Sequence, residues 1–474
     1  MAFQSPKFIV IRSDEKKEYL GFSHDNGKYD GYLEFSETEV TSPYAKFEVV
    51  EACGKDGMVH IRSCKSNKYL ERTENSSITG GSAYWITATA DKPVEDESKV
   101  SCTLFKLIPV DIVANKVRIM HVQSGCYLCL WRLATSRFMM ASYKVFDGHA
   151  RDIFTIIDWE SLVMLPRYVA FKGDNGKYLS VFQFADRLFL KFGADDVSNP
   201  DVTMEIFVAN DDGNVHIKHV SSGKFWTLDI SDYLTVFSDD TSNNKDTSFR
   251  PFKVNSHSIA LLNLGSNLFC RRSSVEDGFC ANKEFTDSYA RLQVVEPVTK
   301  REISIIKYDL DKSRVYDTEA ILLVENSAIN RDKNQSTTVD VMLDYKDVKS
   351  NIWNTNSPLK LETKATFDVN SFPIIGKDGK VELFDQEQLR NEFNETFITT
   401  FRKQVIHSVV VPPKTKVIVS LIATKGKCDV PFTFKQSDTL NNGNTFTTEM
   451  EGNIYTVSNY YNIEFKTREE PVNA

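Results

Sequence analysis

A pair of short apolar segments recurs six times along the chain with one fixed separation. The first five copies begin with an apolar-x-apolar triplet, and the last copy is degraded to Ser-Ile-Ala. In every copy an aromatic or large apolar pair starts ten residues after the triplet starts. A fixed period of this kind indicates a repeat architecture. The six copies are Ile9-Val10-Ile11 with Tyr19-Leu20, Val59-His60-Ile61 with Tyr69-Leu70, Val117-Arg118-Ile119 with Tyr127-Leu128, Tyr168-Val169-Ala170 with Tyr178-Leu179, Val215-His216-Ile217 with Phe225-Trp226, and Ser258-Ile259-Ala260 with Leu268-Phe269.

The residues between the two parts of each copy are turn-forming, as in QSG at 123–125 and KGDNGK at 172–177. A strand, a Gly-, Asn- or Ser-rich turn and a second strand predict a β-hairpin. The six hairpins fall into two sets of three, spaced by about 50 residues within each set. Three such units, each with one hairpin and two further strands, predict a β-trefoil. A propeller is the alternative for the period alone, but three blades cannot close one.

The predicted fold is all-β, with three domains in 474 residues. The 32 Phe and 18 Tyr favour strands over helices. We expect two tandem trefoils over residues 1–155 and 166–295. From residue 298 the repeat stops, and longer strands rich in Thr, Asn and Asp predict a different, elongated β module over 298–470.

Charge and termini exclude several classes of function. With 57 basic and 65 acidic residues, the net charge of −8 argues against nucleic acid as a partner and against a polybasic membrane anchor. The N-terminal residues have no apolar core of signal-peptide length, and no segment approaches the roughly 18 apolar residues of a membrane-spanning helix. The expected location is therefore cytoplasmic or nucleocytoplasmic, with reduced cysteines.

Several stretches of residues 1–295 match one family: FEV (47–49), DGMVHIR (56–62), NKYL (67–70), YWITA (84–88), CTLFK (102–106), FTIIDW (154–159) and FKGDNGKYL (171–179). On these residues the segment resembles the amaranthin family of plant lectins, also called the agglutinin domain. The resemblance implies two β-trefoils and recognition of a galactose or N-acetylgalactosamine glycan of T-antigen type. It also implies a site near the interface of two subunits, with no metal and no catalysis.

The C-terminal segment carries three further stretches: VPPKTKVIVSLIAT (411–424), CDVPF (428–432) and EGNIYT (451–456). On these residues it resembles the aerolysin-like, natterin-type module. That resemblance implies assembly into a homo-oligomeric ring and insertion of an amphipathic β-hairpin into a membrane on activation.

An aromatic loop is the first candidate for a sugar site. A pyranose is bound by an aromatic ring under its C–H face and by polar groups at its hydroxyls. By the resemblance, Tyr84 and Trp85 match the aromatic loop of the family's site, and Ser82 stands where the family shows larger polar residues. The alternative is that Trp85 belongs to the barrel core. The equivalent loop of the second trefoil offers Asp232 and Tyr233, and the alternative there is an ordinary loop.

A strictly alternating segment at 359–369 is the candidate membrane hairpin. A transmembrane strand needs about 9–11 alternating residues. A turn signal follows at 376–379, and residues 384–393 read as a short amphipathic helix before a second alternating segment at 397–401. The alternative is a half-exposed strand of a soluble sheet, which has the same period. The predicted lipid-facing residues are Leu359, Leu361, Ala365, Phe367 and Val369.

Nothing in the sequence indicates an enzyme, a cofactor or a metal site. The nucleotide-binding, serine-hydrolase and zinc-protease motifs are missing. A C-x-x-C at Cys126 and Cys129 lacks the second ligand pair of a structural zinc site.

Two hypotheses follow. In the first, a defence lectin holds a glycosylated surface and then forms a β-barrel pore, after release or membrane insertion on activation. In the second, a cytosolic, stress-responsive glycan-binding protein uses its C-terminal module as an oligomerisation scaffold.

Overall fold

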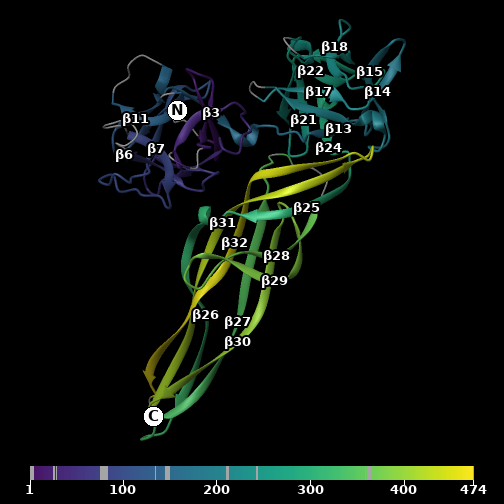
Figure 1. Ribbon diagram of the computed structural model, residues 1–474. Helices are drawn as coiled ribbons and strands as arrows, with labels where there is room; N and C mark the ends of the chain where they lie inside the picture. The colour runs from purple at the N-terminus through teal and green to yellow at the C-terminus, as the bar shows by residue number, and fades with distance from the viewer. Residues whose placement is uncertain are drawn as a thin grey trace. The chain divides into compact units, whose positions relative to one another are not determined.

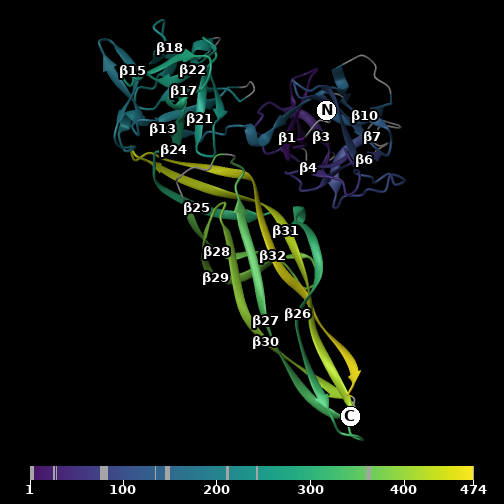
Figure 2. The same ribbon diagram turned by 180° about the vertical axis from the view of Figure 1, so that it is seen from behind.

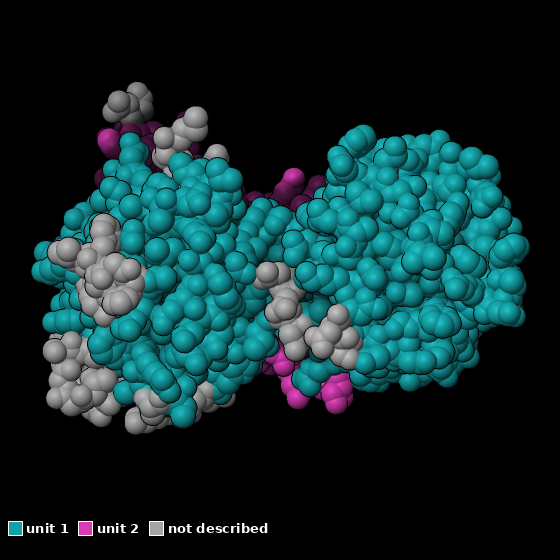
Figure 3. Space-filling view, turned by 90° about the horizontal axis from the view of Figure 1, so that it is seen from above, with its two compact units in different colours: residues 1–302, 356–364, 436–449 teal, residues 303–355, 365–435, 450–474 magenta. Residues whose placement is uncertain are grey.

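The structure is a computed structural model. It describes residues 5–24, 27, 29–74, 84–133, 135–144, 150–209, 213–241, 244–357, 359 and 365–472. The chain divides into two compact units: unit 1 is residues 1–302, 356–364 and 436–449, and unit 2 is residues 303–355, 365–435 and 450–474 (Figure 3).

The described part of the chain is almost entirely β-structure. No helix in it is long and apolar enough to cross a membrane. Among the described residues, the helical elements are six short 3-10 turns: η1 (Ala150–Asp152), η2 (Trp159–Ser161), η3 (Pro200–Val202), η4 (Lys245–Thr247), η5 (Ser288–Ala290) and η6 (Leu310–Lys312).

The first trefoil is a closed six-stranded barrel that carries three hairpins (Figure 1). β1 pairs with β4, β4 with β5, β5 with β8, β8 with β9, β9 with β12, and β12 with β1 again. The hairpins are β2–β3, β6–β7 and β10–β11. The strands are β1 (Phe8–Ser13), β2 (Tyr19–Phe22), β3 (Leu33–Glu37), β4 (Phe47–Glu51), β5 (Val59–Ser63), β6 (Tyr69–Glu74), β7 (Tyr84–Ala90), β8 (Phe105–Asp111), β9 (Lys116–His121), β10 (Cys126–Leu133), β11 (Ser136–Tyr143) and β12 (Phe154–Asp158).

The second trefoil repeats this topology. Its barrel closes through β13, β16, β17, β20, β21 and β24, and its hairpins are β14–β15, β18–β19 and β22–β23. The prediction of two tandem trefoils is confirmed. The strands are β13 (Tyr168–Lys172), β14 (Tyr178–Phe184), β15 (Arg187–Ala194), β16 (Met204–Val208), β17 (Val215–His219), β18 (Phe225–Leu228), β19 (Leu234–Ser238), β20 (Phe249–Lys253), β21 (Ser258–Asn263), β22 (Leu268–Arg272), β23 (Phe279–Lys283) and β24 (Leu292–Val295).

One backbone feature explains why the turn between the two parts of each repeat is rich in Gly and Asn. In all six copies, the residue two places before the first aromatic residue of the repeat pair has a positive φ; in the last copy that aromatic residue is Phe269. Gly adopts this left-handed conformation without steric cost, and Asn tolerates it better than most residues. The six residues are Lys17, Asn67, Gly125, Gly176, Gly223 and Asn267.

Two copies of the repeat differ by one residue from the sequence prediction. Every hairpin has a β-bulge at its repeat pair, and in the last copy the bulge lies between Phe269 and Cys270 rather than one residue earlier. In the fourth copy the turn is one residue shorter, because the Gly173 N–H closes it onto the Lys177 carbonyl. The first-strand residues of that copy that pack in the barrel core are therefore Val169 and Phe171, whereas Ala170 is buried in a separate cluster. A one-residue shift matters because side chains alternate between the two faces of a strand.

Unit 2 is built from long strands (Figure 1, Figure 2). One sheet has the order β25-β31-β32-β27-β30, with β26 paired to β31, and β28–β29 form a separate two-stranded sheet. The start of β25, the end of β31, the start of β32 and the loop between β31 and β32 belong to unit 1. The strands are β25 (Val298–Tyr308), β26 (Arg314–Asn330), β27 (Thr337–Asn354), β28 (Thr366–Ile375), β29 (Val381–Glu392), β30 (Thr396–Val411), β31 (Thr415–Leu440) and β32 (Thr445–Pro471).

The hairpin that corresponds to the predicted membrane hairpin begins later in the chain than the predicted segment 359–369. Its first strand is β28, which begins at Thr366, and Leu359 is instead buried in the hydrophobic core of the second trefoil. Leu361 lies outside the described residues. The helix predicted at 384–393 is wrong, because residues 381–392 form the continuous strand β29, which pairs with β28. The alternating segment at 397–401 belongs to β30, which pairs with β27.

Candidate functional site

Tyr84 lies at the end of the first trefoil's middle hairpin. It begins β7, opposite the end of β6, and residues 75–83 between them, including the predicted Ser82, lie outside the described part of the chain. The Tyr84 ring is half-buried, and the Arg72 guanidinium stacks 4.4 Å from its centroid. This cation–π contact restricts the ring, so that it can serve as a fixed platform at the base of the loop.

Trp85, the neighbour of Tyr84, is a core residue. Its side chain has no exposed surface. The three equivalent repeat positions carry Tyr32, Trp85 and Phe138, whose ring centroids are 6.0, 5.8 and 5.9 Å apart in the three pairs. Edge-to-face packing of this kind is the preferred geometry for aromatic rings. Trp85 therefore closes the hairpin end of the trefoil around its threefold axis.

The two predicted residues of the second trefoil have different environments. Tyr233 occupies the repeat position of Trp85, is half-buried, and pairs with Cys280 of β23. Asp232 has an exposed side chain and a backbone with φ of 64°. Its N–H donates to the Asp229 carbonyl at 3.0 Å, and its carbonyl accepts from Ala281 N–H at 2.8 Å. The Asp232 carboxylate is thus presented from a fixed backbone.

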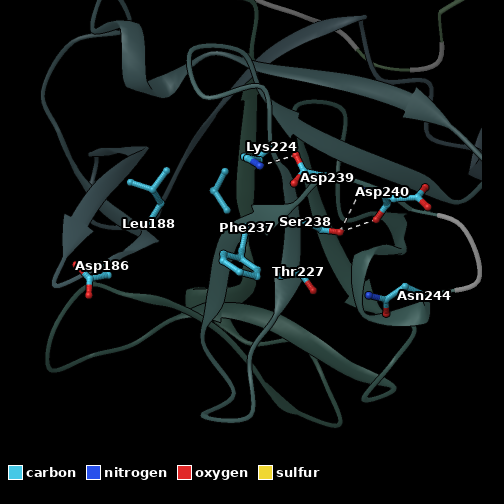
Figure 4. A pocket seen from close by; sticks show the side chains of 10 residues that line it. Asp186, Leu188, Lys224, Thr227, Phe237, Ser238, Asp239, Asp240 and Asn244 are labelled. Atoms are coloured by element: carbon cyan, nitrogen blue, oxygen red, sulfur yellow. Dashed lines mark hydrogen bonds and ion pairs between the residues drawn. The ribbon is translucent and has the colours of Figure 1, made fainter.

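A pocket of about 560 Å³ opens on the second trefoil, and none of its lining was predicted (Figure 4). It lies between the turn of β14–β15 and the hairpin β18–β19. Phe237, at 68% exposure, points into it from β19, whereas its neighbour Val236 is buried in the core. Besides Phe237 and Val236, the lining residues are Asp186, Leu188, Lys224, Thr227, Ser238, Asp239, Asp240 and Asn244.

The polar groups of the pocket are held in place by local contacts. Lys224 and Asp239 form an ion pair across the β18–β19 hairpin (Figure 4). The Ser238 hydroxyl donates to the Asp240 carbonyl at 2.5 Å, and the Asn244 Oδ1 accepts from Asp246 N–H at 2.9 Å. The pocket thus combines one exposed ring with fixed hydroxyl, amide and carboxylate groups.

The β28–β29 hairpin is the second functional candidate, and unit 2 holds its apolar face. Phe367 is buried against Trp353, with ring centroids 5.2 Å apart, and against Phe393 at 4.4 Å. Val369 packs against the same cluster, and Ala365 is buried just before the strand. Of the predicted lipid-facing residues, these three lie at or beside the hairpin.

The comparisons with known proteins concern the two trefoils. The family model of the agglutinin domain matches the chain twice, over residues 3–158 and 163–306. No curated protein matches the chain. Among solved structures, the chain is similar to a designed 3-fold symmetric protein, ThreeFoil, with 14% identity and a TM-score of 0.25, covering 32% of this chain and 99% of that chain.

Proposed function

Because the chain belongs to the agglutinin domain family, we propose that it binds glycans with a terminal galactose or N-acetylgalactosamine, of T-antigen type. Two agglutinin domains give it a carbohydrate-binding function of lectin type, which is binding without catalysis. The observation that carries the proposal is the Tyr84 ring, held by Arg72 at the base of the middle-hairpin loop. A ring fixed before binding loses little conformational entropy when a sugar stacks on it.

The exposed Asp232 supports a contribution from the second trefoil. Its carboxylate can accept hydrogen bonds from sugar hydroxyls, and its backbone is fixed by two hydrogen bonds. In this proposal a homo-oligomer brings several such surfaces to one glycosylated target, so that weak individual sites give strong binding.

A glycan array with the full chain tests this proposal. We expect binding to galactose- and N-acetylgalactosamine-terminated glycans, and at least tenfold weaker binding by Tyr84→Ala with an unchanged melting temperature. Tyr289→Ala is the matched control, since Tyr289 is also half-buried and stacks on Arg271 at 4.8 Å. Equal binding by wild type and Tyr84→Ala would remove Tyr84 from the site.

The C-terminal module supports an aerolysin-like function, in which β28–β29 leaves unit 2 and inserts into a membrane as part of a β-barrel pore. Three observations support this. The hairpin is hydrogen-bonded as a sheet of its own. Its strands have 10 and 12 residues, which is enough to cross a bilayer. Its apolar residues Phe367 and Val369 lie on one face.

Dye-loaded vesicles that contain a galactose-terminated glycolipid test the pore. Dye release and ring-shaped particles in electron micrographs are the expected results. Bound particles that never release dye, under any activating condition, would contradict the pore and leave glycan binding intact.

The contacts that hold the hairpin favour a second candidate. Tyr308 donates its hydroxyl hydrogen to the Ser371 carbonyl at 3.2 Å, and Asn459 binds the backbone of Ile375. A hairpin held this firmly suits a cytoplasmic, stress-responsive glycan-binding protein in which unit 2 is an oligomerisation scaffold.

A further inference from the structure

We propose that the pocket at Phe237 is a second carbohydrate site, which binds one neutral hexose or N-acetylhexosamine residue. The inference rests on the proposed lectin function and adds a site to it. The pocket's volume of about 560 Å³ lies within the range of small-molecule sites. Its open side leaves room for the rest of an oligosaccharide.

Phe237 supplies the apolar platform. The aromatic residues of the repeat pairs are buried or half-buried, but 68% of the Phe237 side chain is exposed. The bulge of the β18–β19 hairpin explains this exposure. Phe225 pairs with Ser238 and Trp226 pairs with Val236. Phe237 is therefore the extra residue between the two pairs and turns outward. A large exposed ring with polar groups around it matches a sugar, which offers an apolar C–H face and hydroxyls at its rim.

The polar groups around the ring match sugar hydroxyls. The Asp186 and Asp239 carboxylates are hydrogen-bond acceptors, and the Asn244 amide and the Thr227 hydroxyl add donors. These groups come from separate segments of the second trefoil and lie on different sides of Phe237 (Figure 4). Binding would therefore need no residue of the first trefoil, and the two sites would act independently.

The charge of the pocket restricts the ligand. The pocket lining contains three carboxylates, on Asp186, Asp239 and Asp240, and a single lysine, Lys224. Asp239 pairs with that lysine, so the lysine does not neutralise the charge of Asp186 as well. An acidic sugar would bring its own carboxylate into this excess of negative charge, which is unfavourable. The site therefore selects neutral sugars.

Saturation-transfer NMR with the full chain tests the inference, with free N-acetylgalactosamine as the probe. In Tyr84→Ala, which removes the first site, we expect the probe still to bind. Adding Phe237→Ala should then weaken its binding at least tenfold. Phe285→Ala is the matched control, since Phe285 is 66% exposed on the same trefoil and lies outside the pocket lining.

The outcomes separate the two proposals. Loss of all binding in Tyr84→Ala would overturn the second site and leave the lectin function standing. The second site would also be overturned if Tyr84→Ala binds the probe and the added Phe237→Ala change does not weaken that binding. A wild-type chain that binds no sugar would overturn both.

A second measurement tests the selection by charge, with N-acetylneuraminic acid as an acidic probe. In the Tyr84→Ala background we expect N-acetylgalactosamine to bind and N-acetylneuraminic acid not to bind. The further changes Asp186→Asn and Asp239→Asn remove two negative charges and should allow the acidic sugar to bind. Equal binding of both sugars before these changes would overturn the assignment to neutral sugars.

Discussion

The Tyr233 ring lies against Gly278: a Cβ atom placed on Gly278 would stand 2.6 Å from Tyr233 Cε1. In the first trefoil the same repeat positions carry Trp85 and Phe138, with ring centroids 5.9 Å apart. The second trefoil thus fills with one ring the space that two rings fill in the first. A glycine is needed at 278 because the Tyr233 ring occupies the space of a side chain. The backbone conformation does not require a glycine there, because the φ of Gly278 is not positive.

Gly278→Ala should destabilise the second trefoil by about 1–3 kcal/mol, because the added methyl group overpacks the Tyr233 ring. Urea unfolding measures the change. In a Tyr233→Ala background the same substitution should cost little, because the ring is gone. An equal cost in both backgrounds would mean that Tyr233 is not the cause.

Arg301 joins two buried carboxylates within unit 1. It donates to Asp438 at 2.7 and 2.8 Å and to Glu296 at 2.6 and 3.0 Å. The three side chains are 9%, 2% and 6% exposed. Arg301→Ala leaves two buried negative charges without their partner, so we expect a loss of about 3–5 kcal/mol in the free energy of unfolding.

The adjacent residue provides the control for Arg301. Lys300 pairs with Glu302 at 2.5 Å, but the two side chains are 68% and 61% exposed. Lys300→Ala should therefore change stability by less than about 1 kcal/mol. Denaturant unfolding measures the free energy of unfolding of both variants. Similar losses in Arg301→Ala and Lys300→Ala would contradict the claim that burial makes the Arg301 ion pairs important for stability.

His121 should make the first trefoil acid-sensitive. Burial lowers its pKa below the usual 6.5, and the nearby Arg72 charge acts in the same direction, against the hydrogen bond to the Cys102 carbonyl, which raises it. The unfolded chain therefore binds a proton at this residue at a higher pH than the folded chain does. The contribution of His121 to stability is present above about pH 6.5 and is lost as the pH falls toward its folded pKa, by at most about 1.4 kcal/mol per pH unit.

Unfolding at pH 7.5 and 5.5 measures this effect. We expect a smaller loss of stability between these values in His121→Gln than in the wild type. His257→Gln is the control, because His257 is exposed. If His121→Gln loses as much stability between pH 7.5 and 5.5 as the wild type does, other groups cause the acid sensitivity. One such group is His219, whose pKa is lowered by burial against the raising effect of Asp201.

Asn459 should control how readily the β28–β29 hairpin opens. Its side chain, 2% exposed, accepts from Ile375 N–H at 3.1 Å and donates to the Ile375 carbonyl at 2.9 Å. Asn459→Ala leaves these buried groups unpaired, at a cost of about 1–3 kcal/mol. Amide hydrogen exchange in residues 366–392 should then rise roughly 5- to 150-fold. Asn326→Ala, at an exposed site in unit 2, should leave it unchanged.

Periodicity predicted the trefoils because each hairpin is a local structure. The turn residues Asn67 and Gly125 adopt a positive φ that their residue types favour, and the repeat pair marks each bulge. The hairpin β28–β29 was only partly predicted, because alternation also fits a soluble strand. Residues 384–393 matched a helical pattern, and pairing with β28 overrode it.

For the candidate sites, sequence reasoning located Tyr84 and Asp232 at hairpin ends. It could not tell that these residues are more exposed than their neighbours Trp85 and Tyr233. Phe237 was missed because the segment LTVFS reads as an ordinary core strand. A bulge between Phe225 and Trp226 sets the register of its hairpin, and with it the outward direction of Phe237.

By itself, the sequence determined that the chain forms two trefoils and a different β module, because the offset of ten residues and the turn types are local properties. Only the tertiary structure decided which aromatic residues are core and which face solvent. Trp85 is buried because Tyr32 and Phe138, each about 53 residues away along the chain, meet it at the threefold axis. Leu359 likewise joins the second trefoil's core from a distant segment. Such burial depends on contacts between residues far apart in the chain, which no local pattern specifies.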